Sequence, residues 1–161
     1  MLSTIGRQAA ISPVAPAGPR LRLQPDQSLP TLLDGGWWPR SADPVAELPG
    51  LILALDERHG RVTRVLLGAA DWSAPRPRGL QVGPAGSRVV RLGWFATMPA
   101  GLLTAFSADG QRTDLVTIPP QTSEQDAAAA MEQAAQAANR EHAPAILADI
   151  SVAPAVGAGS S

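Results

Sequence analysis

Alternating polar and apolar positions divide the middle of the chain into short runs that are typical of β-strands. Residues 20–25 alternate arginine and leucine and end in a proline, which predicts a half-buried strand. The segment at 31–41 is strand-like at its centre and is interrupted by Gly35, Gly36 and Pro39. Further β-branched or alternating runs predict strands at 61–67, 78–82, 88–92, 102–108 and 111–118.

Apolar residues recur at helical spacing between positions 45 and 55, which predicts an amphipathic helix. Asp43 can cap its first turn, Pro44 suits the first helical position, and Gly60 can end the helix. Pro49 interrupts the pattern, since a proline inside a helix removes one backbone hydrogen bond. Either the first turn is therefore separate, or the helix is kinked.

A second helix follows Pro119-Pro120 and is rich in alanine. Thr122 and Gln125 have the spacing of a capping box, in which two side chains satisfy the first free backbone N–H groups of a helix. We expect this helix to begin there and to extend to about residue 139. Its small side chains allow close packing against a sheet.

The clearest hairpin joins the strands at 102–108 and 111–118. Asp109-Gly110 between them is the favoured dipeptide for a two-residue turn with positive φ. In the register of such a turn, one face carries Leu102, Phe106 and Leu115, and the other carries Leu103, Val116 and Ile118. Apolar residues on both faces predict a central hairpin that is covered on both sides, or one that contacts a partner on one face.

The order of these elements predicts an α+β fold: a mostly antiparallel sheet of about five to seven strands with two helices packed on it, in a single domain. We assign this domain to residues 20–140. Residues 1–19 are rich in Pro, Ala and Gly and show no period, so we expect a disordered N-terminal arm. Residues 141–161 are similar in composition and predict a flexible C-terminal tail.

The composition excludes several kinds of site. There is no cysteine, which excludes disulfides, thiolate catalysis and cysteine metal ligands. His59 and His142 stand apart from any nucleophile or ligand pattern, and no glycine-rich phosphate loop opens a helix. We therefore expect no catalytic residues, no metal and no cofactor. No stretch approaches the roughly 18 apolar residues of a membrane span, so we expect a cytoplasmic protein without membrane contact.

Positive charge is concentrated in the centre of the chain. All basic residues are arginine, and residues 58–91 contain seven of them with a single acid, Asp71, a formal charge of +6. Aromatic residues accompany this charge: Trp72 lies within the region, and Trp94 and Phe95 follow it directly. Such a surface can bind a polyanion through phosphate pairing and stacking. Arg88 and Arg91, however, are three residues apart, so in a regular strand they point to opposite faces, and no single basic stripe is predicted.

The most distinctive segment is DGGWWPRS at 34–41. If it is extended, Trp37 and Trp38 point to opposite faces. Trp37 is then expected in the core, and Trp38 partly exposed beside Arg40 as a cation–π pair. Since Pro39 cannot donate to a strand ladder, we expect this strand at the edge of the sheet, or a loop that crosses it.

Two interpretations of this segment remain open. In the first, both tryptophans pack under the first helix, and Arg40 forms an ion pair with Asp34 or Asp43. In the second, an exposed groove binds a ligand or partner, because Trp and Arg are enriched among interface anchors. The candidate binding residues in that groove are Trp38, Arg40, Ser41 and Trp72.

The DGGWWPRS segment, the later RVVRLGWF strand at 88–95, and the pairs Asp109-Gly110 and Pro119-Pro120 carry a family resemblance. Over about residues 20–139 the chain resembles an uncharacterised actinobacterial domain family, a domain of unknown function with a D-G-x-W-W-P-R-S signature. The resemblance implies these domain limits and a bacterial origin. It implies no activity, substrate or cofactor.

The sequence favours a non-enzymatic binding or interaction module, in which the Trp/Arg surface engages a protein partner or a small anionic ligand. One alternative is an Arg-rich nucleic-acid-binding domain. Another is a small enzyme that uses carboxylates together with Ser41 or His59. The identity of the partner, the strand order and the oligomeric state do not follow from the sequence.

Overall fold

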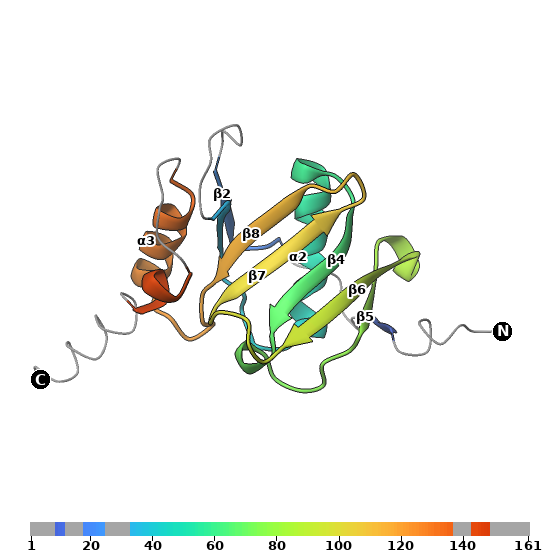
Figure 1. The fold of residues 1–161 in the computed structure, drawn as a ribbon, viewed down its shortest axis with the longest axis horizontal. Helices are drawn as coiled ribbons and strands as arrows, with labels where there is room; N and C mark the ends of the chain where they lie inside the picture. Colours follow the sequence, from blue (N-terminus) through green and yellow to red (C-terminus); the bar gives the residue numbers. More distant parts are fainter. Residues whose placement is uncertain (1–8, 12–17, 25–32, 137–142, 149–161) are drawn as a thin grey trace, which may run out of the picture.

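The structure, a computed structural model, describes residues 9–11, 18–24, 33–136 and 143–148. Its strands are β1 (Ala9–Ile11), β2 (Leu21–Leu23), β3 (Gly35–Trp37), β4 (Val62–Gly68), β5 (Gly79–Val82), β6 (Arg88–Phe95), β7 (Leu102–Ser107) and β8 (Arg112–Thr117). Its longer helices are α2 (Pro44–His59) and α3 (Glu124–Ala134). The strands form one sheet in the order β1-β5-β6-β4-β7-β8-β3-β2 (Figure 1).

The predicted α+β class, with a mostly antiparallel sheet and two packed helices in a single domain, is confirmed: four of the seven strand pairings are antiparallel. Strands β2 to β8 match the expected number, and β1 adds an eighth by pairing in parallel with β5. The structure thus places Ala9–Ile11 of the expected disordered arm in a strand. Three residues are too few to show an alternating pattern, and the open edge of β5 supplies their pairing.

Helix α2 forms as its capping residues predict. The Asp43 side chain accepts a hydrogen bond from the Val45 backbone N–H at 3.0 Å, and Pro44 is the first helical residue. Gly60 ends the helix with a positive φ of 91°. The helix continues through Pro49, so the alternative of a separate first turn is wrong. Its apolar side packs on the sheet strongly enough to tolerate the backbone hydrogen bond that Pro49 cannot make.

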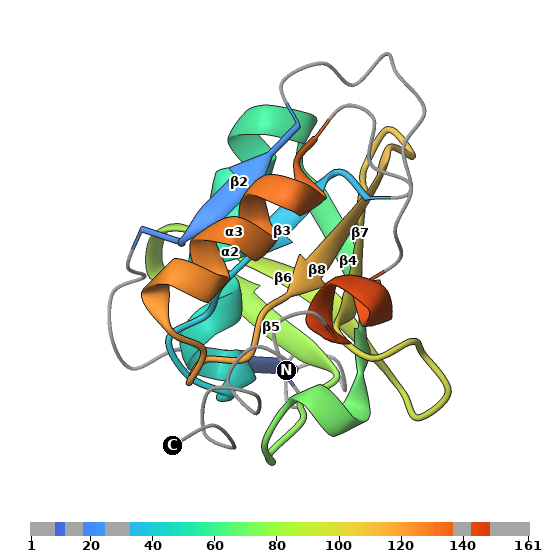
Figure 2. The same ribbon diagram turned by 90° about the vertical axis from the view of Figure 1, so that its left-hand side faces the viewer.

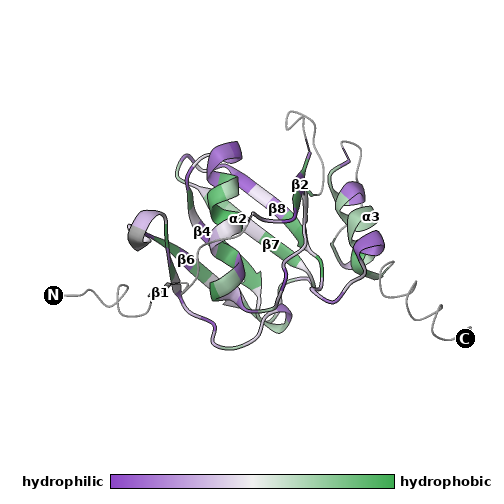
Figure 3. Cartoon of the chain, turned by 180° about the vertical axis from the view of Figure 1, so that it is seen from behind, coloured by the Kyte–Doolittle hydropathy of each residue, from purple (hydrophilic) through white to green (hydrophobic). Residues whose placement is uncertain are grey.

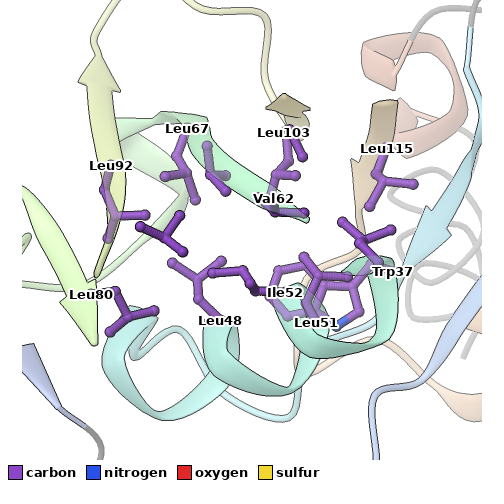
Figure 4. Packing of buried hydrophobic residues seen from close by; sticks show 14 of the residues in the cluster. Trp37, Leu48, Leu51, Ile52, Val62, Leu67, Leu80, Leu92, Leu103 and Leu115 are labelled. Carbon is purple, nitrogen blue, oxygen red and sulfur yellow. The ribbon is translucent and has the colours of Figure 1, made fainter. Parts of the chain in front are cut away.

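The main hydrophobic core lies between α2 and the sheet (Figure 4). Leu48, Leu51 and Ile52 of α2 are fully buried there. They pack against strand residues that include Trp37, Val62, Leu67, Leu80, Leu92, Leu103 and Leu115. Burying one leucine of this kind stabilises the fold by about 1.5–3 kcal/mol. Trp37 also stacks on Trp72, with ring centroids 5.6 Å apart and planes inclined by 28°.

A second hydrophobic cluster lies on the opposite face, at the β2–β3–β8 end of the sheet. Figure 2 shows α3 lying at this end. Helix α3 covers the cluster with Ala127, Ala130 and Ala134. Residues 143–148, within the predicted flexible tail, form a short helical segment whose Ile146 is buried in the same cluster. The hairpin of β7 and β8 is therefore covered on both faces where it meets this end, as one of the two alternatives predicted.

The register of this hairpin differs from the predicted one by a single residue. The loop contains three residues, since the Ser107 N–H donates to the Gln111 carbonyl at 2.9 Å, and Gly110 adopts a φ of 87°. Leu103 consequently faces Leu115. A shift of one residue exchanges the two faces of a strand, so the predicted grouping of Leu102 with Leu115 is wrong. The same Asp-Gly dipeptide suits both loop lengths.

Two further predictions, the position of β3 in the sheet and the bounds of α3, are wrong. Strand β3 lies inside the sheet, parallel to β8 and antiparallel to β2, and is not an edge. It ends at Trp37, so the missing N–H of Pro39 falls outside the ladder. Helix α3 is capped by Ser123, whose hydroxyl accepts from the Asp126 N–H at 3.2 Å, in place of Thr122. The helix ends at Ala134, short of residue 139.

The central strands carry hydrophilic and hydrophobic residues interspersed without strict alternation, as the coloured cartoon shows (Figure 3). Among the described residues, none of the helices has the length and apolar character needed to cross a membrane.

We predict that Gly35→Ala destabilises the protein. A Cβ atom at this position would lie 2.1 Å from the backbone oxygen of Arg22 in the neighbouring strand. Since a backbone atom cannot rotate away, the β2–β3 pairing must open, at a cost of about 1–3 kcal/mol in the free energy of unfolding. Urea unfolding measures this loss. Gly18→Ala is the control, because its Cβ would meet nothing within 4 Å, and equal midpoints for both variants would contradict the prediction.

Candidate functional site

One face of the central strands is left open by the helices. Helix α2 covers one face, and α3 packs mainly on β2, β3 and β8 at the end of the other. Along β4, Val65 and Leu67 point into the core beneath α2 and are fully buried, so Arg64 and Leu66 point to the opposite side. On β4 and β6 the residues of this open face, such as Arg64, Leu66, Arg91 and Phe95, are partly or largely exposed.

A cavity of about 630 Å³ lies on this open face. We call it the basic groove and define it by Arg64, Leu66, Arg78, Arg91, Gly93 and Phe95. Its three arginines come from three strands or their ends. Arg64 and Arg91 are register partners in the parallel pair β4–β6, and Gly79 pairs with Arg91 from the other side. Arg78, the residue before Gly79, therefore lies beside them.

The positive charge of the basic groove is not neutralised by neighbouring side chains. Arg64, Arg78 and Arg91 form no ion pair with a carboxylate in the described part of the chain. Arg64 instead lies over the Phe106 ring, 4.6 Å from its centroid. Three guanidinium groups without a described carboxylate partner around one cavity produce a local positive potential that attracts anions.

Aromatic surface lies next to this charge. Phe95 is 47% exposed, and a Cβ added to Gly93 would lie 3.0 Å from its ring, so the ring lies close over Gly93. The indole of Trp94 is fixed by a 2.7 Å hydrogen bond from its Nε1–H to the Pro77 carbonyl. A second hollow of about 280 Å³ shares Leu66 and Phe95 with the groove. It extends the groove across β7 towards Arg112.

The strand pairing explains why the sequence alone did not locate this groove. Arg88 and Arg91 do point to opposite faces, as their spacing predicts: Arg88 forms an ion pair with Asp56 of α2, whereas Arg91 lines the groove. The basic surface is built across strands, and its register depends on the parallel pairing of β4 with β6. No signal in a single strand specifies that pairing.

Trp38 is buried, although the sequence predicted that it would be partly exposed. Trp38 is only 9% exposed and belongs to the cluster beneath α3, where its Nε1–H donates to the Pro120 carbonyl at 3.3 Å. The cation over its ring is Arg20, at 3.6 Å from the centroid, in place of Arg40. Arg20 also donates from Nε to the Trp38 carbonyl at 2.9 Å. The predicted Trp38–Arg40 pair is therefore wrong.

The other predicted site residues also lie apart. Arg40 is exposed, and its guanidinium donates to the Gly18 carbonyl at 3.0 Å, so neither of its expected ion pairs with Asp34 or Asp43 forms. Ser41 donates from Oγ to the Glu47 carboxylate at 3.0 Å. Trp72 is buried against Trp37. Of the four candidates, Ser41 and Trp72 line a common cavity, of about 270 Å³.

The residues suggested for a small enzyme are likewise separated. Ser41 precedes α2 and His59 is its last residue, so the helical rise alone holds them roughly 22 Å apart. The His59 Nδ1 lies 2.7 Å from the Thr113 hydroxyl, which links the end of α2 to β8. His142 lies outside the described residues. No group of three His, Asp or Glu side chains in the described ranges is arranged to hold a metal ion.

Burial shifts the pKa values of two groups at this end of α2. Burial lowers the pKa of His59, with Asp34 opposing and Arg58 adding to the shift. Burial also raises the pKa of Asp34, against the effect of a hydrogen bond from the Asp114 N–H. The lowered pKa favours the neutral form of His59, which contacts the Thr113 hydroxyl.

We predict that Trp38→Ala and Arg40→Ala have very different effects on stability. Removing the buried indole of Trp38 leaves a cavity beneath α3 and should cost about 3–5 kcal/mol of unfolding free energy. Removing the exposed Arg40 side chain should change it by no more than about 0.5 kcal/mol. Thermal or urea unfolding of both variants measures the difference. Equal losses would contradict the burial of Trp38.

We predict that the protein loses stability as the pH falls from 7.5 to 5.5, and that His59 causes part of this loss. Because the folded pKa of His59 lies below the unfolded value, the unfolded chain takes up a proton first, and stability falls below about pH 6.5. One such proton accounts for at most about 1.4 kcal/mol per pH unit. In His59→Gln the melting temperature should depend less on pH. An identical pH dependence would contradict the lowered pKa of His59 in the folded protein.

A family model describes most of the chain. It matches residues 20–134 and carries the description of a family of unknown function (DUF5994). Neither the curated proteins nor the solved structures contain a match to this sequence. The matched range includes every strand from β2 to β8 and both α2 and α3, and thus the whole basic groove. The chain belongs to the family of unknown function DUF5994.

Proposed function

We propose that this protein is a non-enzymatic binding module whose basic groove takes a small anionic ligand. The observation that carries the proposal is the convergence of Arg64, Arg78 and Arg91 on one cavity without a described carboxylate partner. A guanidinium presents a planar fork of N–H donors that matches phosphate and carboxylate oxygens. A phosphate or carboxylate group would therefore replace the missing partner of these side chains.

The remainder of the ligand is expected to be flat and partly apolar. Phe95 presents nearly half of its surface beside the arginines, and Leu66 adds apolar surface at the base of the groove. The volume of about 630 Å³ lies within the roughly 300–1,000 Å³ of pockets that hold small molecules. An anionic group joined to a planar ring suits this combination.

A small ligand fits this surface better than the protein partner that the sequence also suggested. Among the described residues, the exposed large apolar side chains are Val89 and Phe95. A stable protein interface needs a wider apolar core than two such side chains supply. We therefore place the binding function at the basic groove, and no longer at Trp38 and Arg40.

Single-stranded nucleic acid is a second candidate, and one observation favours it. The groove continues across β7 into the second hollow, where Phe106 and Arg112 follow Phe95. Aromatic rings on an open sheet face can stack successive bases while arginines pair with phosphates. The net charge of −1 for the whole chain argues against strong nonspecific binding.

The proposal includes the cellular setting suggested by the sequence, an actinobacterial cytoplasm. The exclusive use of arginine among the 13 basic residues supports a GC-rich source. Detection of the protein in the membrane fraction of its source cell would contradict this setting.

We predict that adenosine monophosphate, which joins a phosphate to a planar ring, binds the protein and that binding depends on the groove arginines. Charge-assisted hydrogen bonds contribute about 1.5–3 kcal/mol each, so Arg64→Gln and Arg91→Gln should each weaken binding about tenfold or more. Titration calorimetry at low salt measures the affinity. Arg58→Gln is the matched control, because Arg58 is exposed on α2, on the other face of the sheet.

Pyrophosphate and a labelled single-stranded RNA octamer complete the test. Binding of the octamer alone, with an affinity that falls steeply as salt increases, would favour the nucleic-acid candidate. Absence of binding by all three probes at low salt would remove the proposed function. Unaltered binding in both groove variants would do the same.

A further inference from the structure

A further cavity lies at the carboxyl ends of interior strands of the sheet, away from the basic groove. Strands β3, β4 and β8 run in the same direction and end together there, at Trp37, Gly68 and Thr117. The segments that leave these strands enclose a cavity of about 270 Å³. Crevices outside the carboxyl ends of co-directional strands are common ligand sites in open sheets. We call this cavity the Asp71 pocket and define it by Pro39, Ser41, Asp71, Trp72, Thr117 and Pro120.

Thr117 supplies the first sign that something binds here. Its side chain is 8% exposed, and its hydroxyl is the buried side-chain polar atom that lacks a hydrogen-bond partner in the described part of the chain. An unsatisfied buried polar group costs about 1–3 kcal/mol. Valine would fill the same space without that cost. A ligand that hydrogen-bonds to the hydroxyl would explain why threonine, and not valine, occupies this position.

Asp71 supplies the charge. Its carboxylate accepts a 3.0 Å hydrogen bond from the Gly101 N–H, and the Gly101 carbonyl accepts from the Thr117 N–H at 2.6 Å. Gly101 thereby holds Asp71 and Thr117 on neighbouring sides of the pocket. Burial raises the pKa of Asp71, and the hydrogen bond from Gly101 opposes this shift. The described residues that line the pocket include no arginine or histidine to neutralise the carboxylate.

The walls around these two groups are mostly apolar. Trp72, stacked on Trp37, forms one of them, and Pro39, Pro119 and Pro120 form others. Leu147 closes one side, since a Cβ added to Gly101 would lie 2.1 Å from its Cδ1 atom. A carboxylate in such surroundings attracts a cation more strongly than one in open water, because fewer water molecules compete with the ligand.

We infer that the Asp71 pocket binds a small primary ammonium group with a short apolar chain, independently of the basic groove. The ammonium has three N–H donors, of which one can pair with the Asp71 carboxylate and another with the Thr117 hydroxyl. The apolar chain would lie against Trp72 and the prolines. An anion would be repelled by Asp71, and a neutral alcohol of the same shape would lose the charge-assisted hydrogen bond.

The test uses n-butylammonium as the probe, with n-butanol and butyrate as its neutral and anionic counterparts. We expect n-butylammonium to shift the amide NMR signal of Gly101 and the indole signal of Trp72 in a saturable manner, whereas the other two probes leave both signals in place. If n-butanol shifted the same two signals with equal affinity, the pocket would not recognise the positive charge, and the proposal would be wrong. Absence of shifts with n-butylammonium would overturn the site itself.

Two variants separate binding from folding. Asp71→Asn should weaken the binding of n-butylammonium about tenfold or more, and Thr117→Val should weaken it severalfold. Because its hydroxyl has no described partner, Thr117→Val should leave the melting temperature unchanged or raise it. A clear fall in the melting temperature of Thr117→Val, or unchanged affinity in that variant, would contradict the proposal. Glu57→Gln, an exposed carboxylate near the far end of α2, is the control.

Discussion

Trp37 and Trp72 stack beneath α2, and this contact joins the strand before the helix to the turn after β4. The end of β3 and the turn after β4 are thus held together on one face of the sheet, although β7 and β8 lie between the two strands. Helix α2, which connects β3 to β4, packs on that same face, and its leucines complete the core there. The opposite face of β4 and β6 is left open, and the basic groove forms there as a consequence.

The two candidate sites have opposite charge and lie on different parts of the sheet. The basic groove gathers arginines on an open face, whereas the Asp71 pocket gathers an acid and a hydroxyl among apolar walls at the strand ends. Solvent weakens each arginine contact in the groove, so several of them must act together. In the smaller pocket a single carboxylate has more effect, because Asp71 is half-buried among apolar walls.

Local signals in the sequence predicted the elements well, because their causes are local. The Asp43 cap, Pro44 and Gly60 define α2 through contacts within a few residues. The register of the β7–β8 hairpin was missed, since Asp109-Gly110 suits loops of two and three residues equally. The environment of Trp38 was missed for another reason: its cover is α3, which begins more than eighty residues later in the chain. The groove likewise depends on pairing between strands distant in sequence.

The parallel pairing of β3 with β8 constrains the order in which this protein can assemble. Gly35 is the register partner of Leu115, and Trp37 that of Thr117. Strand β2, which precedes β3, can pair with it early, but almost the entire family domain must leave the ribosome before β3 can pair with β8. Until that moment the apolar side of α2 lacks the part of its cover that β7 and β8 supply in the folded protein, and exposed apolar surface of this kind favours aggregation. The long-range pairing of β3 with β8 thus leaves the chain most prone to aggregation while it is being synthesised.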